Sequence, residues 1–274
     1  TVKEAVDLLA KYKDEAKLLA GGHSLLPAMK LRLAQPKHLI DIGKVSGLAG
    51  VKEEGGTLVI GAMTTHYAIE SSAVLKSKCP LLPEVAGHIG DPMVRNMGTL
   101  GGSLAHADPA ADWPAAVIAL GAELVAEGPK GKRTLKADDF FKGLLTTALA
   151  EDEILTEIRV PACGANVKCA YAKFPHPASR FAVVGVAAVL TMDGGKISKA
   201  SIGITGAGTK ATRAKGVEAA IAGKPADAAS IQAAASSAAE GVDVQADLQG
   251  SVEYKQHLLR VFAKRAMEAA AAKK

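Results

Sequence analysis

The sequence has 274 residues, of which 49% are hydrophobic and 22% are charged, with a formal net charge of +5. A chain of this length can form two or three subdomains with cores of their own. Lys and Arg are scattered and aromatic residues make up only 4% of the chain, so a nucleic-acid-binding surface is not indicated. No stretch of about 18 apolar residues occurs, so no membrane-spanning segment is expected.

The cysteines exclude some redox chemistry. Cys79, Cys163 and Cys169 form no C-x-x-C pair, and three thiols cannot supply the four ligands of an iron–sulfur cluster. The five residues between Cys163 and Cys169 do not match the usual spacing of a zinc site. We therefore expect scattered, reduced thiols and a cytoplasmic protein.

The first fifty residues are expected to form a helix followed by a β-loop-α-β unit. Thr1 begins an S/T-x-x-E capping box, followed by apolar residues at helical spacing. Strands are expected at 17–20 and 38–42, with a helix capped by Ser24 at 25–33. Units of this kind favour parallel pairing of their strands.

The next part of the chain, to residue 164, is expected to mix strands with short helices, the first of them capped by Thr65. Residues 113–118 form an apolar run. Strands are expected at 57–62, 123–126 and 154–160, and helices at 65–74 and 81–89.

Beyond residue 164 the pattern changes to long apolar strands and alanine-rich helices. Asp193-Gly194-Gly195-Lys196 is typical of a hairpin turn. The sequence thus predicts three parts, at 1–50, 51–164 and 165–274. In the last part, strands are expected at 167–174, 181–192 and 197–204, and helices at 212–223, 226–239 and 251–272.

Two Gly-Gly pairs, each beside a hydroxyl, are the most distinctive local patterns. The first glycine motif is Ala20-Gly21-Gly22-His23-Ser24, and the second is Thr99-Leu100-Gly101-Gly102-Ser103. Glycine accepts positive φ and lets a ligand approach the main chain. Successive N–H groups in such a turn bind anions, and a helix N-terminus adds positive charge. Either motif alone is more simply a tight turn, but the pair favours a clamp for a diphosphate.

Other candidate groups give weaker patterns. A metal site at His23, His106, Asp108 and Asp112 is poorly supported because His23 is far from the others in sequence, so we favour roles in orienting loops. Neither a G-x-S-x-G elbow nor a P-loop occurs, and residues 203–208 lack the G-x-G-x-x-G register.

Lys173 follows Tyr171 by two residues, so on a strand their side chains share a face. A lysine at this position can hold an anionic ring oxygen. On the pattern alone, a solvated lysine is the simpler expectation.

Two longer segments show a family resemblance. The first segment is Ala20-Gly21-Gly22-His23-Ser24-Leu25-Leu26-Pro27-Ala28-Met29-Lys30-Leu31-Arg32-Leu33, followed by Leu39-Ile40-Asp41-Ile42. It resembles the flavin-binding medium subunits of molybdenum hydroxylases, and among them those of aerobic carbon monoxide dehydrogenases. Residues 94–112 match the second signature of that family, and 171–174 and 252–255 also fit. The resemblance covers nearly the whole chain.

The resemblance implies an α+β fold. The first two parts would form the two-subdomain FAD-binding fold of the vanillyl-alcohol-oxidase-like type, and the third a C-terminal antiparallel sheet with helices. It also implies non-covalent FAD, with the diphosphate on the two glycine motifs. No catalytic or metal-binding residue is implied. The implied cofactor-binding residues are Ala20, Gly21, Gly22, His23, Ser24, Leu25, Thr99, Leu100, Gly101, Gly102, Ser103, Asp112, Leu155, Lys173 and Phe181.

Within this set the resemblance gives four residues individual positions. Asp112 would lie near the ribityl chain, Leu155 near the flavin edge and Lys173 near a ring oxygen. Phe181 would lie close to the ring, where the carbon monoxide enzymes have tyrosine. Phenylalanine keeps the aromatic surface and lacks the hydroxyl.

The implied function is electron transfer within an oxidoreductase complex, without activity on substrate by this subunit alone. A large subunit would carry the molybdenum cofactor and a small subunit two [2Fe–2S] clusters, and FAD would pass their electrons to an unspecified acceptor. The resemblance also implies assembly as a dimer of heterotrimers. Two alternatives are a stand-alone FAD-dependent oxidase and a non-catalytic assembly protein that retains the fold.

Overall fold

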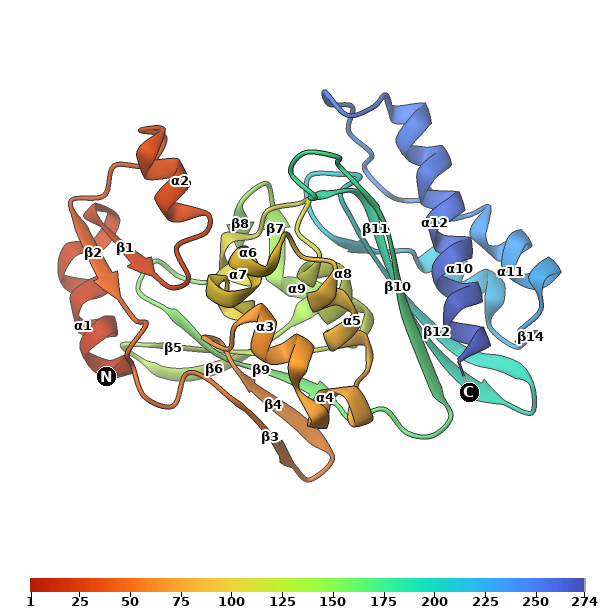
Figure 1. The fold of residues 1–274 in the computed structure, drawn as a ribbon, viewed down its shortest axis with the longest axis horizontal. Helices are drawn as coiled ribbons and strands as arrows, with labels where there is room; N and C mark the ends of the chain where they lie inside the picture. The colour runs from red at the N-terminus through yellow and green to blue at the C-terminus, as the bar shows by residue number, and fades with distance from the viewer. Residues whose placement is uncertain (274) are drawn as a thin grey trace.

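The structure is a computed structural model that describes residues 1–273. Figure 1 shows three parts side by side in chain order, with the N-terminal part at one end and the C-terminal sheet with its helices at the other. Buried apolar residues form three clusters, of which the central one also includes Cys169, Tyr171, Ala187 and Ala211 of the C-terminal part. The predicted α+β class is confirmed.

The N-terminal part is a small parallel sheet covered by a helix. The capping box at Thr1 is confirmed, and so is the parallel pairing, with Ala16 opposite His38. The expected Ser24 side-chain cap is wrong, because the Ser24 side chain makes no capping hydrogen bond. The elements are α1 (Val2–Tyr12), η1 (Lys13–Glu15), β1 (Ala16–Leu19), α2 (Leu25–Lys30) and β2 (His38–Asp41).

The central part is an antiparallel five-stranded sheet with the order β3-β4-β9-β5-β6. Its strands are β3 (Val51–Glu54), β4 (Thr57–Gly61), β5 (Glu123–Gly128), β6 (Gly131–Lys136) and β9 (Ile154–Pro161). A small hairpin lies apart from it, formed by β7 (Phe141–Gly143) and β8 (Thr146–Thr147). The two edge strands of the sheet, β3 and β6, carry few apolar residues, so their sequences gave no strand signal.

Helices pack against the central sheet. Thr65 caps the first of them, as predicted. The expected helix 65–74 is divided, because Ser72 leaves the helical conformation and caps a second helix. The helices are α3 (His66–Ser71), α4 (Ala73–Lys78), α5 (Leu81–Gly87), α6 (Pro92–Met97), α7 (Leu100–His106), α8 (Trp113–Ala119) and α9 (Ala137–Phe140).

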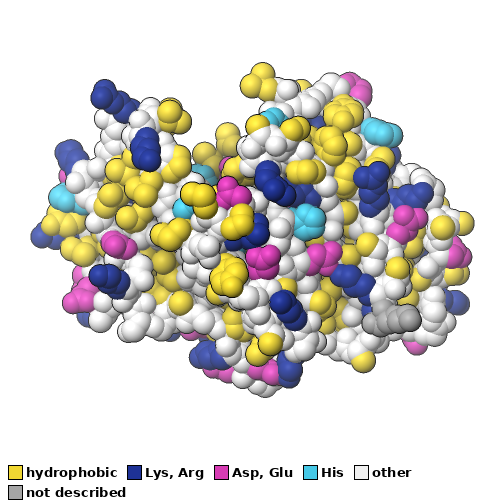
Figure 2. Space-filling model, viewed as in Figure 1, with side chains coloured by type: hydrophobic (Ala, Val, Ile, Leu, Met, Phe, Trp, Pro, Cys, Tyr) yellow, Lys and Arg dark blue, Asp and Glu magenta, His cyan; other side chains and the backbone are white. Residues whose placement is uncertain are grey.

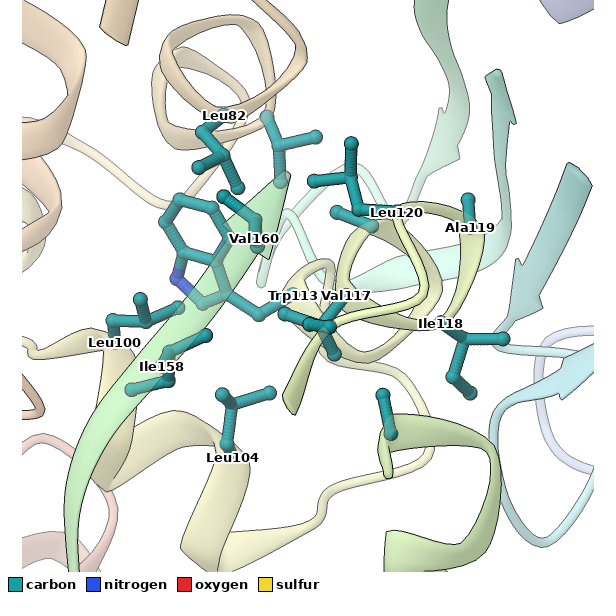
Figure 3. Packing of buried hydrophobic residues seen from close by; sticks show 14 of the residues in the cluster. Leu82, Leu100, Leu104, Trp113, Val117, Ile118, Ala119, Leu120, Ile158 and Val160 are labelled. Carbon is teal, nitrogen blue, oxygen red and sulfur yellow. The ribbon is translucent and has the colours of Figure 1, made fainter. Parts of the chain in front are cut away.

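Trp113 lies at the centre of the middle core. It is fully buried at the start of α8, and Figure 3 shows its indole between Leu82, Leu100, Ile158 and Val160. An aromatic side chain of this size contributes a large share of the apolar area that a core removes from water. Trp113 therefore joins α5, α7 and β9, while the helix that it begins, α8, packs against β11 and β12 of the C-terminal sheet.

The C-terminal part is an antiparallel sheet backed by helices. The hairpin at 193–196 is confirmed, and α12 packs along β10 and β11. The first two helices are shorter than expected. The elements are β10 (Val167–Pro175), β11 (Ala182–Asp193), β12 (Lys196–Thr205), β13 (Thr212–Arg213), α10 (Lys215–Ile221), β14 (Lys224–Pro225), α11 (Ala228–Ala235) and α12 (Val252–Ala272).

The central and C-terminal parts meet at the turn of residues 108–112. Thr205 Oγ1 donates to the carbonyl oxygens of Pro109 and Ala111, each at 2.7 Å. The backbone N–H of Gly206 also donates to Pro109 O, and that of Ala182 to Ala110 O. Within residues 1–273, no helix has the length and apolar character needed to cross a membrane.

Candidate functional site

The first glycine motif connects β1 to α2 and leaves its main-chain donors open. Gly22 has φ of +74°, a left-handed conformation that favours glycine. Over residues 21–25, none of the backbone N–H groups has an acceptor in the described part of the chain. Successive open N–H groups of this kind form a concave site for an anion. The main-chain donors that an anion would need at this motif are therefore open.

The second glycine motif is not a loop with open N–H groups. Thr99 caps α7, and Gly101 and Gly102 lie in its first turn without left-handed conformations. The N–H of Leu100 donates to Thr64 O, that of Gly101 to Ala62 O, and that of Gly102 to Thr99 Oγ1. The expectation of a second open loop of N–H groups is thus wrong. What this motif offers a ligand is the O–H of its Thr99 and Ser103 side chains.

The two motifs lie against each other. A Cβ placed on Gly21 would lie 2.1 Å from Met97 O, and one on Gly102 would lie 3.4 Å from the Cβ of Ala20. Glycine at position 21 therefore permits main-chain contact between the two segments, which any side chain would separate. Figure 2 shows the surface hollowed between the part that carries α2 and the C-terminal part.

A second group of predicted residues forms a buried polar cluster. Tyr171 donates its hydroxyl to Asp112 Oδ1 at 2.5 Å, and Lys173 donates to Asp112 Oδ2 at 2.8 Å. Lys173 also donates to the His88 carbonyl at 3.1 Å. The Lys173 side chain is only 1% exposed, so the expectation of a solvated lysine is wrong. One donor of the ammonium group remains without an acceptor among the described residues.

Burial and the neighbouring charge of Lys173 have opposite effects on the pKa of Asp112 in this cluster. Burial raises the pKa of Asp112, while the Lys173 ammonium and the two donated hydrogen bonds oppose that rise. Burial and the neighbouring Asp112 raise the pKa of Tyr171 well above its ordinary value. Tyr171 therefore remains a hydroxyl donor at neutral pH.

The remaining predicted residues border these two groups. Leu155 is buried on β9, next to Thr156, whose carbonyl accepts from Ala62 N. Phe181 is 45% exposed at the start of β11, beside the turn of residues 108–112. His23 is exposed, and its Nδ1 lies 2.9 Å from Gly21 O. Asp108 Oδ1 accepts from Ala110 N, which agrees with the expected role in orienting a loop.

His66 belongs to this region and was not predicted. It is 4% exposed, and its Nδ1 accepts from Trp113 Nε1 at 3.1 Å. Burial is the main cause that lowers the pKa of His66 to about 4, with smaller contributions from His23 and Arg95. The T-T-H sequence at 64–66 has the form of an ordinary helix cap, so it gave no functional signal.

The cysteines are not scattered in space. The Cys163 thiol lies beside those of Cys79 and Cys169. The contact with Cys169 lowers the pKa of Cys163, but the contact with Cys79 and burial outweigh it and raise this pKa to about 12. All three are free thiols. Cys163 also lines a cavity of about 250 Å³ at the end of β9, facing Val189 and Lys199 of the C-terminal sheet. Protonated thiols of this kind are poor nucleophiles.

The open N–H groups and hydroxyls of the two motifs suit a phosphate-bearing cofactor. The sequence pattern of the family described as "FAD binding domain in molybdopterin dehydrogenase" matches residues 1–163, and that of the "CO dehydrogenase flavoprotein C-terminal domain" matches residues 169–270. The chain therefore belongs to the family of FAD-binding subunits of molybdenum hydroxylases. The predicted family is confirmed.

Individual relatives match this chain over nearly its full length. The chain is 45% identical to the carbon monoxide dehydrogenase medium chain of Hydrogenophaga pseudoflava, covering 98% of this chain and 94% of that protein. It is 36% identical to the nicotine 6-hydroxylase medium subunit of Paenarthrobacter nicotinovorans, covering 100% and 95%. A solved structure of the Hydrogenophaga pseudoflava carbon monoxide dehydrogenase superposes with a TM-score of 0.96 at 47% identity, covering 99% and 95%.

The buried ion pair of Lys173 and Asp112 predicts that single and double substitutions lower the free energy of unfolding by different amounts. Asp112→Asn keeps an acceptor for Tyr171 but leaves the buried Lys173 ammonium without a counter-charge, so the free energy of unfolding should fall by about 3 kcal/mol. The Asp112→Asn/Lys173→Met protein should lose less, because no unpaired charge remains. Urea denaturation of the cofactor-free proteins measures both values. Equal losses in the two proteins would contradict this account.

His66 predicts a pH-dependent contribution to stability. Its pKa of about 4 in the folded protein lies below the ordinary value, so between about pH 6.5 and 4 the unfolded chain binds more protons. The stability of the parent protein relative to His66→Phe should therefore fall by about 3 kcal/mol as the pH decreases through this range. Urea denaturation at several pH values tests this, with the exposed His257→Phe as control. A pH-independent difference would contradict the prediction.

Proposed function

We propose that this chain binds one FAD without a covalent link and carries electrons between the iron–sulfur clusters of a partner subunit and an acceptor. The observation that carries the proposal is the run of open N–H groups at 21–25, lying against the hydroxyl-bearing second motif. These groups suit a diphosphate, which accepts many hydrogen bonds and carries negative charge. The bound flavin supplies the redox chemistry.

Each residue group has a separate task in this proposal. Gly21 to Leu25 donate main-chain N–H groups to the diphosphate, and Thr99 and Ser103 donate hydroxyls. Ala20, Leu100, Gly101 and Gly102 keep the two motifs in contact. Gly22 supplies the left-handed turn, and the exposed His23 borders the site.

The second group lies toward the flavin. Lys173 directs its remaining donor at a ring oxygen, held in place by Asp112 and the His88 carbonyl. Asp112 lies near the ribityl chain, Leu155 lines the flavin edge, and Phe181 lies against the ring. This assignment is supported by the turn of residues 108–112, which ends at Asp112 and whose Ala110 carbonyl accepts from Ala182 N at the start of β11.

The proposed assembly contains a small iron–sulfur subunit and a large molybdenum subunit, arranged as a dimer of heterotrimers in the cytoplasm. The three cysteines of this sequence are too few for one cluster, so the clusters must lie elsewhere. Within the chain, we propose subdomains at 1–50, 51–164 and 165–274. The three clusters of buried apolar residues, each of which lies mainly in one of these segments, support this division.

Carbon monoxide is the substrate that we propose for the whole complex. The 45% identity to a carbon monoxide dehydrogenase medium chain supports it. The relative from a nicotine hydroxylase, at 36% identity, shows that medium subunits of similar sequence serve other substrates. The substrate test must therefore be made on the complete complex, by comparing carbon monoxide with aromatic heterocycles.

The cofactor assignment predicts about one FAD per chain, released by acid denaturation. Gly21→Ala should weaken FAD binding at least about tenfold, because a Cβ there collides with Met97 O. Flavin fluorescence quenching measures the affinity, and circular dichroism checks the fold. The matched control is Gly143→Ala, where a Cβ meets no atom within 4 Å. Flavin that stays with the denatured chain, or no FAD binding at all, would overturn the assignment.

The subunit assignment predicts that the purified chain, loaded with FAD, oxidises neither carbon monoxide nor purines. Activity should appear only in the complex with the iron–sulfur and molybdenum subunits, because the substrate-oxidising centre lies outside this chain. The measurement is dye reduction by substrate with a metal-free preparation. Substrate-dependent reduction by the isolated chain would support the stand-alone oxidase instead.

A further inference from the structure

We propose that His66 is an additional FAD-binding residue, which donates its Nε2–H to the cofactor's diphosphate at the contact between the two glycine motifs. This inference rests on the proposed function and adds a side-chain donor from α3 to the main-chain donors of the first motif. The glycine signatures do not include this residue. Its role follows from a buried hydrogen bond that determines where the imidazole proton lies.

The tautomer of His66 is determined by Trp113. An indole nitrogen can only donate, so Nδ1 of His66, at 3.1 Å from Trp113 Nε1, must be the acceptor. A neutral imidazole that accepts at Nδ1 carries its proton at Nε2 and donates from there. The lowered pKa of His66 agrees with a neutral ring at pH 7. His66 is therefore an oriented N–H donor.

The Nε2 donor has no acceptor within residues 1–273. Every fully buried side-chain nitrogen and oxygen in this part of the chain has a partner. Since Nε2 has none, it must lie at the accessible edge of a side chain that is otherwise 96% buried, given its exposure of 4%. An N–H donor that is fixed in position and has no acceptor lowers the stability of the fold, unless a ligand or a water molecule accepts its hydrogen bond.

The position of Nε2 indicates which ligand completes the hydrogen bond. A Cβ on Gly98 would lie 2.6 Å from His66 Nε2, and one on Gly21 would lie 2.9 Å from the Cα of Gly98. The same segment is fixed by the His66 N–H, which donates to Gly98 O at 3.0 Å. His66 thus lies beside the peptide that the first glycine motif contacts, within reach of an acceptor bound at residues 21–25.

Three variants of His66 test the proposal. Gln places its amide N–H₂ about where Nε2 lies, whereas Asn reaches only to the Nδ1 position and Phe fills the space without a donor. We expect His66→Phe and His66→Asn to weaken FAD binding about tenfold or more, and His66→Gln to stay within about threefold of the parent protein. ADP, which carries the diphosphate without the flavin, should show the same order.

The outcomes separate this inference from the proposed function. If the parent protein binds no FAD, the proposed function fails. If the parent protein binds FAD and folded His66→Phe binds it equally well, only the role of His66 is overturned. Equal weakening by Gln and Phe would assign His66 to packing instead.

A measurement on the parent protein covers the case in which the variants do not fold. Nitrogen-15 NMR of histidine-labelled protein should show one histidine as the Nε2–H tautomer at pH 7. The fluorescence of Trp113, the single tryptophan, checks that the core is folded. The Nε2 resonance of this histidine should shift when ADP or FAD is added, without a change of tautomer. An Nδ1–H tautomer, or no shift on saturation with FAD, would overturn the proposal.

Discussion

The close approach of two peptide segments determines the geometry of the site. Gly21 lies against the Met97 carbonyl at a distance that no Cβ permits. This contact holds the turn between β1 and α2, with its open main-chain donors, against the start of α7, where Thr99 and Ser103 carry hydroxyls. A larger residue at position 21 would force the segments apart and separate the two sets of donors, whatever their individual conformations.

Within this contact the two motifs differ in how their main-chain groups are used. In the second motif, the N–H groups of Leu100, Gly101 and Gly102 bond to Thr64 O, Ala62 O and the Thr99 hydroxyl, so they are not open to a ligand. The first motif leaves its N–H groups open. None of residues 21–25 is buried, so these open N–H groups are accessible to a ligand, and a run of them in one turn is more informative about an anion than the glycines themselves.

Local sequence signals predicted much of this arrangement. The capping box at Thr1, the parallel β1–β2 unit and the hairpin at 193–196 follow from patterns of neighbouring residues. The edge strands β3 and β6 were not predicted because they carry few apolar residues. The burial of Lys173 and the meeting of Cys79, Cys163 and Cys169 depend on contacts between distant segments, and no local pattern records these. The cofactor residues came from the family resemblance and remain predictions at the level of individual contacts.

The C-terminal part does more than cover the FAD-binding fold. Asp112 belongs to the central part, yet both of its hydrogen-bond donors, Tyr171 and Lys173, come from β10. The turn that ends at Asp112 is fixed by Thr205 and by the backbone N–H groups of Ala182 and Gly206. A buried carboxylate is stable as an anion only while its partners stay in place. The position and charge of Asp112 therefore depend on the docking of the C-terminal sheet, so the polar half of the site exists only when the two parts are folded together.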